Sequence, residues 1–213
     1  MNNKNYIPAL KLHFLTPFYD IFLPILLPEK KLKEKILMTA HITKNDKILD
    51  FGCGTGNLML MFLKHIEGVQ IFGVDVDDKI TGIAKRKLRE NNLKAEILIY
   101  DGKNLPFPDE HFTVVVSTLV FHHLRPGQKI PALREIHRVL KKGGHIIIGD
   151  FGKPRNGVMR ILSFFLSILE PTEENINGLI PAFMSDAGFV QIHEDYTMMT
   201  LFGNIDITCG VKG

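Results

Sequence analysis

The sequence predicts an α/β fold in which a doubly wound, mostly parallel sheet of seven strands ends in an antiparallel C-terminal hairpin strand. Three observations lead to this prediction. Five continuous apolar runs alternate with helical patterns, as in a parallel sheet that helices cover on both faces. A glycine turn at residues 52–56 separates the first run from a helix. After Gly188 the chain changes to two strand-like runs joined by a short turn.

The strands follow from these runs in chain order. The five apolar runs are residues 47–51, 70–74, 96–100, 113–117 and 145–149. The two later runs, 189–200 and 204–211, flank Leu201, Phe202 and Gly203 and fit a closing hairpin. The last strand is therefore expected to run antiparallel to its neighbours.

Apolar residues at helical spacing predict the helices between the strands. They form one set on Ile80, Ala84 and Leu88, and another on Ile130, Leu133, Ile136 and Leu140. Gly143 and Gly144 follow the second set and are expected to end that helix, because glycine is the favoured residue just past a helix end.

The chain is expected to form one domain over residues 1–213, with a helical cap at 1–40 and a cap insertion at 152–181. Residues 7–27 and 161–169 are strongly apolar, but proline and charge interrupt the first and the second has only nine residues. Neither fits a membrane span of roughly 20 apolar residues. They fit either core and homodimer interface or a lid over a lipophilic substrate.

Charge and cysteine content narrow the class of protein. The net charge of +3 is too small to indicate a nucleic-acid partner. The two cysteines, Cys53 and Cys209, do not suggest a disulfide framework, and no signal peptide is visible, so a cytoplasmic protein is expected. No cysteine or histidine spacing indicates a metal site.

The glycine turn indicates a nucleoside site. Asp50 ends the first strand, glycines follow at 52, 54 and 56, and Asp75 closes the next strand. Glycines let the backbone approach a ligand closely, and an acid at the end of the second strand suits ribose hydroxyls. The alternative is a tight turn that binds nothing.

The same residues discriminate between nucleoside cofactors. A dinucleotide site needs glycine where this chain has Asn57, and a pyrophosphate would pass close to the Asp50 carboxylate, which would repel it. A ligand with a cationic ammonium and sulfonium would tolerate this charge. S-adenosylmethionine (SAM) is such a ligand.

Successive segments resemble, in order, the motifs of class I SAM-dependent methyltransferases, from roughly Leu15 to the C-terminus. They are residues 49–56, 73–75, 100–102, 105–109, 117–124 and 134–144, and together they are similar to the subgroup near the ubiquinone/menaquinone C-methyltransferases. The resemblance implies a Rossmann-like methyltransferase fold. One residue departs from it: Thr113 follows Phe112 where the subgroup usually has aspartate, a position that supports local packing.

Each motif residue has an expected role toward SAM. Asp75 should accept the ribose hydroxyls, and Val76 should pack on adenine. Asp101 should accept from the adenine amino group and the Gly102 N–H should donate to the ring, although Asp101 could instead cap the following turn. Backbone groups should hold the methionine end, from Gly52, Gly54, Thr118 and Leu119. Tyr19 looks like the tyrosine that covers SAM in similar enzymes, or is an ordinary core aromatic.

His122 and His123 follow the fourth strand at the sheet edge where such folds bind ligands. Either could serve as a general base for the methyl acceptor, because histidine has a suitable pKa. The alternative is a structural role that closes the loop. Asp150 and His13 are weaker candidates for the base.

The sequence thus predicts a SAM-dependent methyltransferase for a small, apolar acceptor molecule. A dehydrogenase is disfavoured because Asn57 replaces the third glycine. A non-catalytic SAM-binding regulator, or a subunit that needs a partner, is the alternative of a different class.

Overall fold

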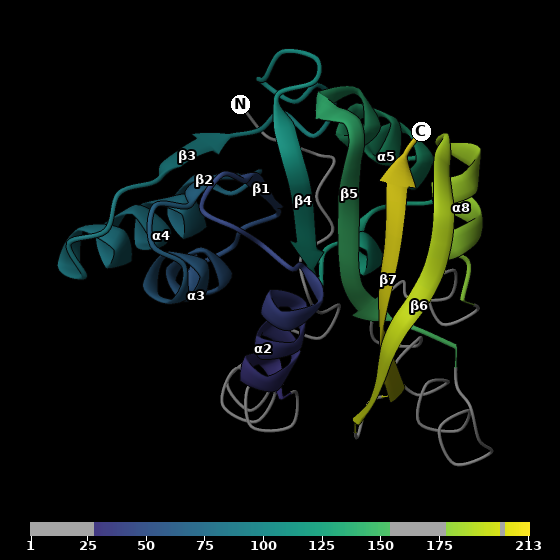
Figure 1. Cartoon of the computed structure of the whole chain (residues 1–213), viewed down its shortest axis with the longest axis horizontal. Coiled ribbons are helices and arrows are strands. Elements are labelled where there is room, and N and C mark those ends of the chain that lie inside the picture. Colours follow the sequence, from purple (N-terminus) through teal and green to yellow (C-terminus); the bar gives the residue numbers. More distant parts are fainter. Residues whose placement is uncertain (1–27, 154–177, 201–202) are drawn as a thin grey trace, which may run out of the picture.

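The computed structural model describes residues 28–153, 178–200 and 203–213. These residues form one seven-stranded sheet in the order β3-β2-β1-β4-β5-β7-β6, with β3 at one edge and β6 at the other (Figure 1). The strands are β1 (Lys47–Phe51), β2 (Gln70–Asp75), β3 (Glu96–Ile99), β4 (Phe112–Thr118), β5 (Leu140–Phe151), β6 (Phe189–Thr200) and β7 (Gly203–Lys212). The first five are parallel and β7 runs antiparallel to both β5 and β6, which confirms the predicted fold class.

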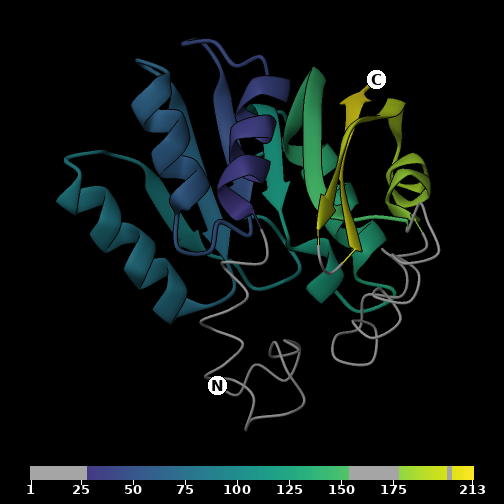
Figure 2. The same ribbon diagram turned by 90° about the horizontal axis from the view of Figure 1, so that it is seen from below.

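Helices cover both faces of the sheet (Figure 2). On one face lie α2 (Glu29–Thr39), α3 (Asn57–His65) and α4 (Asp78–Glu90), and on the other lie α5 (Lys129–Val139) and α8 (Ile180–Asp186). Each face buries its own apolar cluster, because a parallel strand presents side chains to both sides in turn. Ala84 and Leu88 of α4, and Leu133 and Ile136 of α5, are buried as their spacing predicts.

The predicted end of α5 is wrong. The helix stops at Val139, and Leu140 is already extended and pairs with Phe112 of β4. Gly143 and Gly144 lie inside β5 instead, near a register shift in the β4–β5 pairing. A Cβ at Gly144 would meet the Thr113 carbonyl oxygen at 2.9 Å, so the glycine is needed for the close approach of two strands.

Thr113 takes over a packing role at the start of β4. Its hydroxyl donates to Asp46 Oδ1 at 2.8 Å and accepts from the Lys47 N–H at 3.0 Å. The hydroxyl therefore ties β4 to the loop before β1, where the resemblance led us to expect an aspartate to support the structure.

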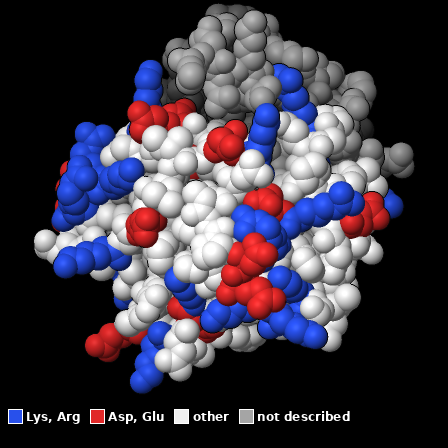
Figure 3. Space-filling view, turned by 90° about the horizontal axis from the view of Figure 1, so that it is seen from above, with Lys and Arg blue, Asp and Glu red and all other residues white. Residues whose placement is uncertain are grey.

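The predicted caps are described only in part. Residues 1–27 and 154–177 lie outside the described residues, so the N-terminal cap is described from Pro28 and the insertion only at its two ends. Among the described helices, none is long and apolar enough to cross a membrane. On the face shown in Figure 3, basic and acidic side chains lie next to one another, so neither sign forms a continuous field there.

Candidate SAM-binding site

A cleft of about 300 Å³ opens where the carboxyl ends of the parallel strands meet. The turn after β1, the end of β2, the loop after β3 and the turn after β4 line it together. Eight of the eleven residues predicted to bind the cofactor line this cleft: Gly52, Gly54, Asp75, Val76, Asp101, Gly102, Thr118 and Leu119. Of the other three, Asp50 and Gly56 lie behind the lining and Tyr19 lies outside the described residues.

The three glycines of the turn all have left-handed backbones, with φ of +74° at Gly52, +52° at Gly54 and +75° at Gly56. A Cβ at Gly52 would overlap the Val120 side chain, and one at Gly56 would lie 3.0 Å from the Ala84 Cβ of α4. These two glycines therefore serve packing within the protein. A Cβ at Gly54 would meet nothing within 4 Å, so this position leaves the space of the cleft open.

Asp75 is held in place by the backbone around the cleft. Its Oδ2 accepts from the Gly54 N–H at 2.9 Å and its Oδ1 accepts from the Asp77 N–H at 3.1 Å. An ionised carboxylate offers about four acceptor positions, so each oxygen can also accept a ligand hydroxyl. The half-buried carboxylate is thus oriented before any ligand binds.

Asp101 is exposed at the end of β3 and caps the turn that follows. Its Oδ1 accepts from the N–H groups of Asn104 at 2.9 Å and Lys103 at 2.7 Å. These hydrogen bonds hold the pKa of the carboxyl below its usual value. Asp101 therefore caps the following turn through Oδ1. Its other oxygen, Oδ2, is the one that could accept from the adenine amino group.

Asp50 lies beneath the glycine turn and is 2% exposed. Burial raises the pKa of its carboxyl to about 7, while the charge of Lys33 on α2 acts in the opposite direction. Among the described residues, neither Asp50 Oδ2 nor the buried hydroxyl oxygen of Thr118 has a hydrogen-bond partner. Buried polar atoms without partners are costly, so these atoms call for a partner that the described residues do not supply, such as a ligand group, a water molecule or another part of the chain.

These features fit SAM. Gly54 leaves a space that any side chain would occupy, and a buried hydroxyl oxygen without a partner among the described residues belongs to Thr118, which lines the cleft. Gly52 donates its backbone N–H to the Val74 carbonyl and Gly54 donates its own to Asp75, so both of these N–H groups of the glycine turn already have acceptors within the protein. Carbonyl and carboxylate oxygens suit a cation, as the sequence predicts for this end of the cofactor.

We expect SAM affinity to depend on pH through Asp50. The ionised carboxylate attracts an ammonium group and the protonated acid does not, so affinity should rise as the pH passes through about 7. Because this pKa is raised above the value of 3.8 for an unfolded chain, the contribution of Asp50 to the stability of the ligand-free protein is fully present below about pH 4 and is lost as the pH rises through about 7.

Calorimetric titration with SAM from about pH 5.5 to 8.5 measures this dependence. The matched variant is Asp50→Asn, which keeps the shape and removes the titration. An affinity that changes equally with pH in both proteins would contradict the assignment to Asp50.

The two histidines have different surroundings. His122 is 4% exposed, and its Nδ1 lies 2.8 Å from Oδ1 of the buried Asp150 on β5. The backbone N–H of His122 also donates to Asp150 Oδ2 at 3.2 Å. His123 lines the cleft, with its ring centroid 3.9 Å from that of His122. Burial, with a smaller effect of the His122 charge, lowers the pKa of His123 to about 3.

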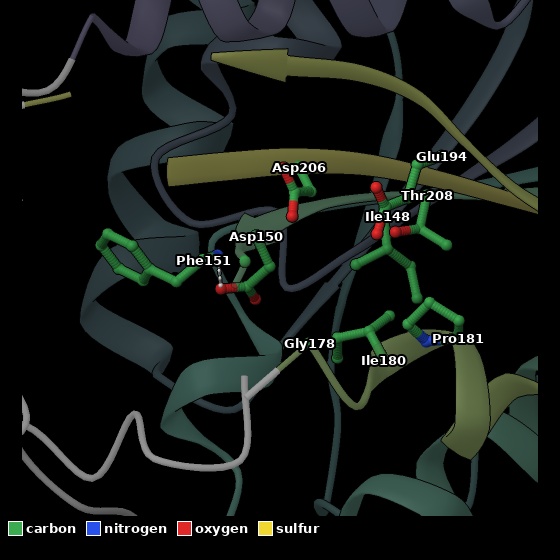
Figure 4. A pocket seen from close by; sticks show the side chains of 10 residues that line it. Ile148, Asp150, Phe151, Gly178, Ile180, Pro181, Glu194, Asp206 and Thr208 are labelled. Atoms are coloured by element: carbon green, nitrogen blue, oxygen red, sulfur yellow. Dashed lines mark hydrogen bonds between the residues drawn. The ribbon is translucent and has the colours of Figure 1, made fainter. Parts of the chain in front are cut away.

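Figure 4 shows a second, smaller pocket that Asp150 lines together with Asp206 and Thr208. The Asp150 carboxylate also accepts from the Phe151 N–H at 2.7 Å, and Asp206 of β7 lies opposite it in the strand register. The cavity between them, which Thr208 also lines, has a volume of about 10 Å³, room for about one water molecule. Because His122 is 4% exposed and Asp150 is 2% exposed, the hydrogen-bonded pair is buried in the protein.

Sequence reasoning missed two parts of the site. Phe51, Tyr100, Leu124, Gln128 and Ala132 also line the cleft, but nothing in their local pattern separates them from core residues. The loop after β3 is also clamped by α5. Glu135 accepts the Leu105 N–H at 2.9 Å, and Arg138 donates to the Phe107 carbonyl at 2.9 Å and to Glu135. The resemblance of residues 134–144 to the family motifs does not by itself indicate that Glu135 and Arg138 fix the loop after β3.

The fold, the glycine turn and the acid at the end of β2 together define a class I SAM-dependent methyltransferase, and the chain belongs to this family. A family model described as a methyltransferase domain matches residues 48–144. The chain is 30% identical to the ubiquinone/menaquinone biosynthesis C-methyltransferase UbiE of Shewanella woodyi in an alignment 183 residues long that covers 72% of this chain and 69% of that protein.

Solved structures show the same fold. A SAM-dependent methyltransferase from Aquifex aeolicus matches with a TM-score of 0.67 and 19% identity, over 93% of this chain and 97% of that one. Phosphoethanolamine N-methyltransferase 2 of Haemonchus contortus, in complex with SAM, matches with a TM-score of 0.70 and 16% identity, over 85% of this chain and 52% of that one. The protein is a SAM-dependent methyltransferase, similar to the UbiE subgroup, and its methyl donor is SAM.

Proposed function

We propose that this methyltransferase acts on a small, uncharged and largely apolar acceptor that enters the cleft beside His123. The observation that carries this proposal is the distribution of charge along the cleft. Among the described residues, the charged ones that line the cleft come from the β2 and β3 ends: Asp75, Asp77, Asp101 and Lys103. The lining near His123 comes from Leu124, Gln128 and Ala132. A charged acceptor would need an opposite charge there, because an unpaired charge is costly to desolvate.

The relatives support the same class of acceptor. The UbiE proteins are named as C-methyltransferases of ubiquinone and menaquinone biosynthesis, and quinones of this kind are lipophilic. The apolar run 161–169, which contains Phe164 and Phe165 and would form a lid over a lipophilic acceptor, lies outside the described residues. The alternative of a homodimer interface rests on the same residues, 161–169, so the lid and the interface both stay predictions.

The proposed contacts to SAM follow the order of the strands. Asp75 accepts the ribose hydroxyls, Val76 packs on adenine, and Asp101 and Gly102 contact the adenine edge. Gly52, Gly54, Thr118 and Leu119 hold the methionine end with Asp50 behind them. SAM supplies an activated methyl group, so the protein contributes mainly orientation and exclusion of water.

His123 is the proposed base for the acceptor proton, and the buried His122–Asp150 pair holds its ring against the cleft. Replacement of His123 by Gln should lower kcat by at least about 100-fold, the lower range for general base catalysis. SAM affinity should change little. Because the pKa of His123 is lowered to about 3, its ring is neutral and can accept a proton but is a weaker base than an ordinary histidine, and kcat at saturating SAM should show no titration of His123 between about pH 5 and 8.

Steady-state kinetics with saturating SAM measure both effects. The control is His65→Gln, which changes an exposed histidine at the end of α3. If His123→Gln lowers the melting temperature and leaves kcat intact, the residue has the structural role that the sequence left open.

Two experiments test the proposed function as a whole. Calorimetric titration with SAM and with NAD separates the methyltransferase from a dehydrogenase, and only SAM should bind. Formation of S-adenosylhomocysteine is then measured with a panel of lipophilic hydroquinones and phenols against charged amines and peptides. Turnover with charged acceptors only would overturn the proposed acceptor class. Binding of SAM without turnover of any acceptor would favour the regulator or the partner-dependent subunit.

A further inference from the structure

Leu119, the first residue after β4, has an unusual backbone conformation. Five non-glycine residues have positive φ in the described part of the chain, and four of them are exposed polar residues: His41, Asn92, Glu110 and Gln191. Leu119 has φ of +56°, is half-buried and lines the cleft. An apolar side chain with a Cβ disfavours this conformation, and such residues persist only where their surroundings impose it.

Four contacts at and around Leu119 hold this conformation. The Leu119 N–H donates to the Gly149 carbonyl of β5 at 2.8 Å, and its side chain packs on the core beneath α2 and α3. Val120, the next residue, fills the space that Gly52 leaves open. Just before the turn, the Ser117 hydroxyl donates to the Phe51 carbonyl at 3.0 Å. The turn after β4 is thus joined to both β5 and the glycine turn after β1.

The conformation places polar groups of β4 at the methionine end of the cleft. Thr118 lines the cleft and has a buried hydroxyl oxygen without a partner among the described residues, and Leu119 reverses the chain directly after it. We infer that Leu119 is a positioning residue for the methyl donor, an inference that rests on the proposed SAM contacts. Its left-handed backbone, and not the volume of its side chain, sets SAM affinity.

The test compares three substitutions at Leu119. Glycine and asparagine tolerate a left-handed backbone, whereas leucine and alanine both have a Cβ that disfavours it. Leu119→Ala removes the side-chain packing that holds this conformation and keeps the Cβ, so the backbone should relax out of the left-handed region and SAM binding should weaken about tenfold. Leu119→Gly and Leu119→Asn should weaken binding about threefold or less. Calorimetric titration with SAM gives the affinities, and circular dichroism verifies that each variant is folded.

Leu124 provides the matched control, because it is also a half-buried leucine that lines the cleft but has φ of −77°. There alanine should be tolerated better than glycine, in both SAM affinity and melting temperature. At Leu119 the order should reverse, and Leu119→Gly should melt about 2–4 °C above Leu119→Ala.

The outcomes separate the two proposals. If affinity follows side-chain size at both leucines, with glycine weakest, the inference about Leu119 is overturned while the SAM site stands. If the unaltered protein does not bind SAM, the proposed SAM contacts fail, and the inference about affinity fails with them. The melting order still decides whether the Leu119 backbone is strained, because it is measured without ligand.

Discussion

Replacement of Gly54 by Val is expected to abolish SAM binding. The Cβ position of Gly54 meets no protein atom within 4 Å, so a valine side chain would enter the cleft between Asp75 and Thr118. Its φ of +52° adds a backbone cost of about 1–2 kcal/mol for a residue with a Cβ. The turn would also tend to leave the geometry in which the Gly54 N–H donates to Asp75.

Calorimetric titration with SAM measures this loss, and thermal denaturation measures the backbone cost. Gly127→Val is the matched control, because Gly127 has φ of +82°, also has open space around its Cβ position, and does not line the cleft. Both variants should lose similar stability, and only Gly54→Val should lose SAM binding. SAM binding of unaltered strength in Gly54→Val would mean that the turn is structural and the ligand binds elsewhere.

Replacement of Asp75 by Ala is expected to weaken SAM binding by about 1.5–3 kcal/mol, the range for hydrogen bonds to a charged group. The structure adds a second consequence. Alanine also removes the acceptor for the N–H groups of Gly54 and Asp77, so the melting temperature should fall as well. The sequence alone predicts little change in stability for this variant, because its pattern shows only a role of the carboxylate toward a ligand.

Asp75→Asn separates the two effects. The amide keeps an acceptor oxygen for only one of the two backbone N–H groups and loses the charge, so stability should be restored in part while SAM affinity stays reduced. Asp78→Ala, at an exposed position in the first turn of α4, controls for loss of an acid nearby. A folded Asp75→Ala protein with unchanged SAM affinity would refute the ribose assignment.

The sequence alone was sufficient for the order and type of the strands. A buried parallel strand must be apolar on both faces, and a covering helix must be apolar on one, so periodicity carries this information locally. The end of α5 was not predictable in this way. Leu140 suits a helix face as well as a strand, and only its pairing with Phe112 of β4 makes it extended.

The sequence by itself also predicted which residues bind SAM, because glycine spacing and acids at strand ends suit the chemistry of the ligand, and eight of these eleven residues line one cleft. Only the tertiary structure decided what each polar group contacts. Asp75 meets Gly54, Asp150 meets His122, and Asp50 Oδ2 has no partner among the described residues. These partners lie 21 and 28 residues apart in the chain. Hydrogen bonding, burial and the resulting pKa values depend on distances in space, which local pattern does not contain.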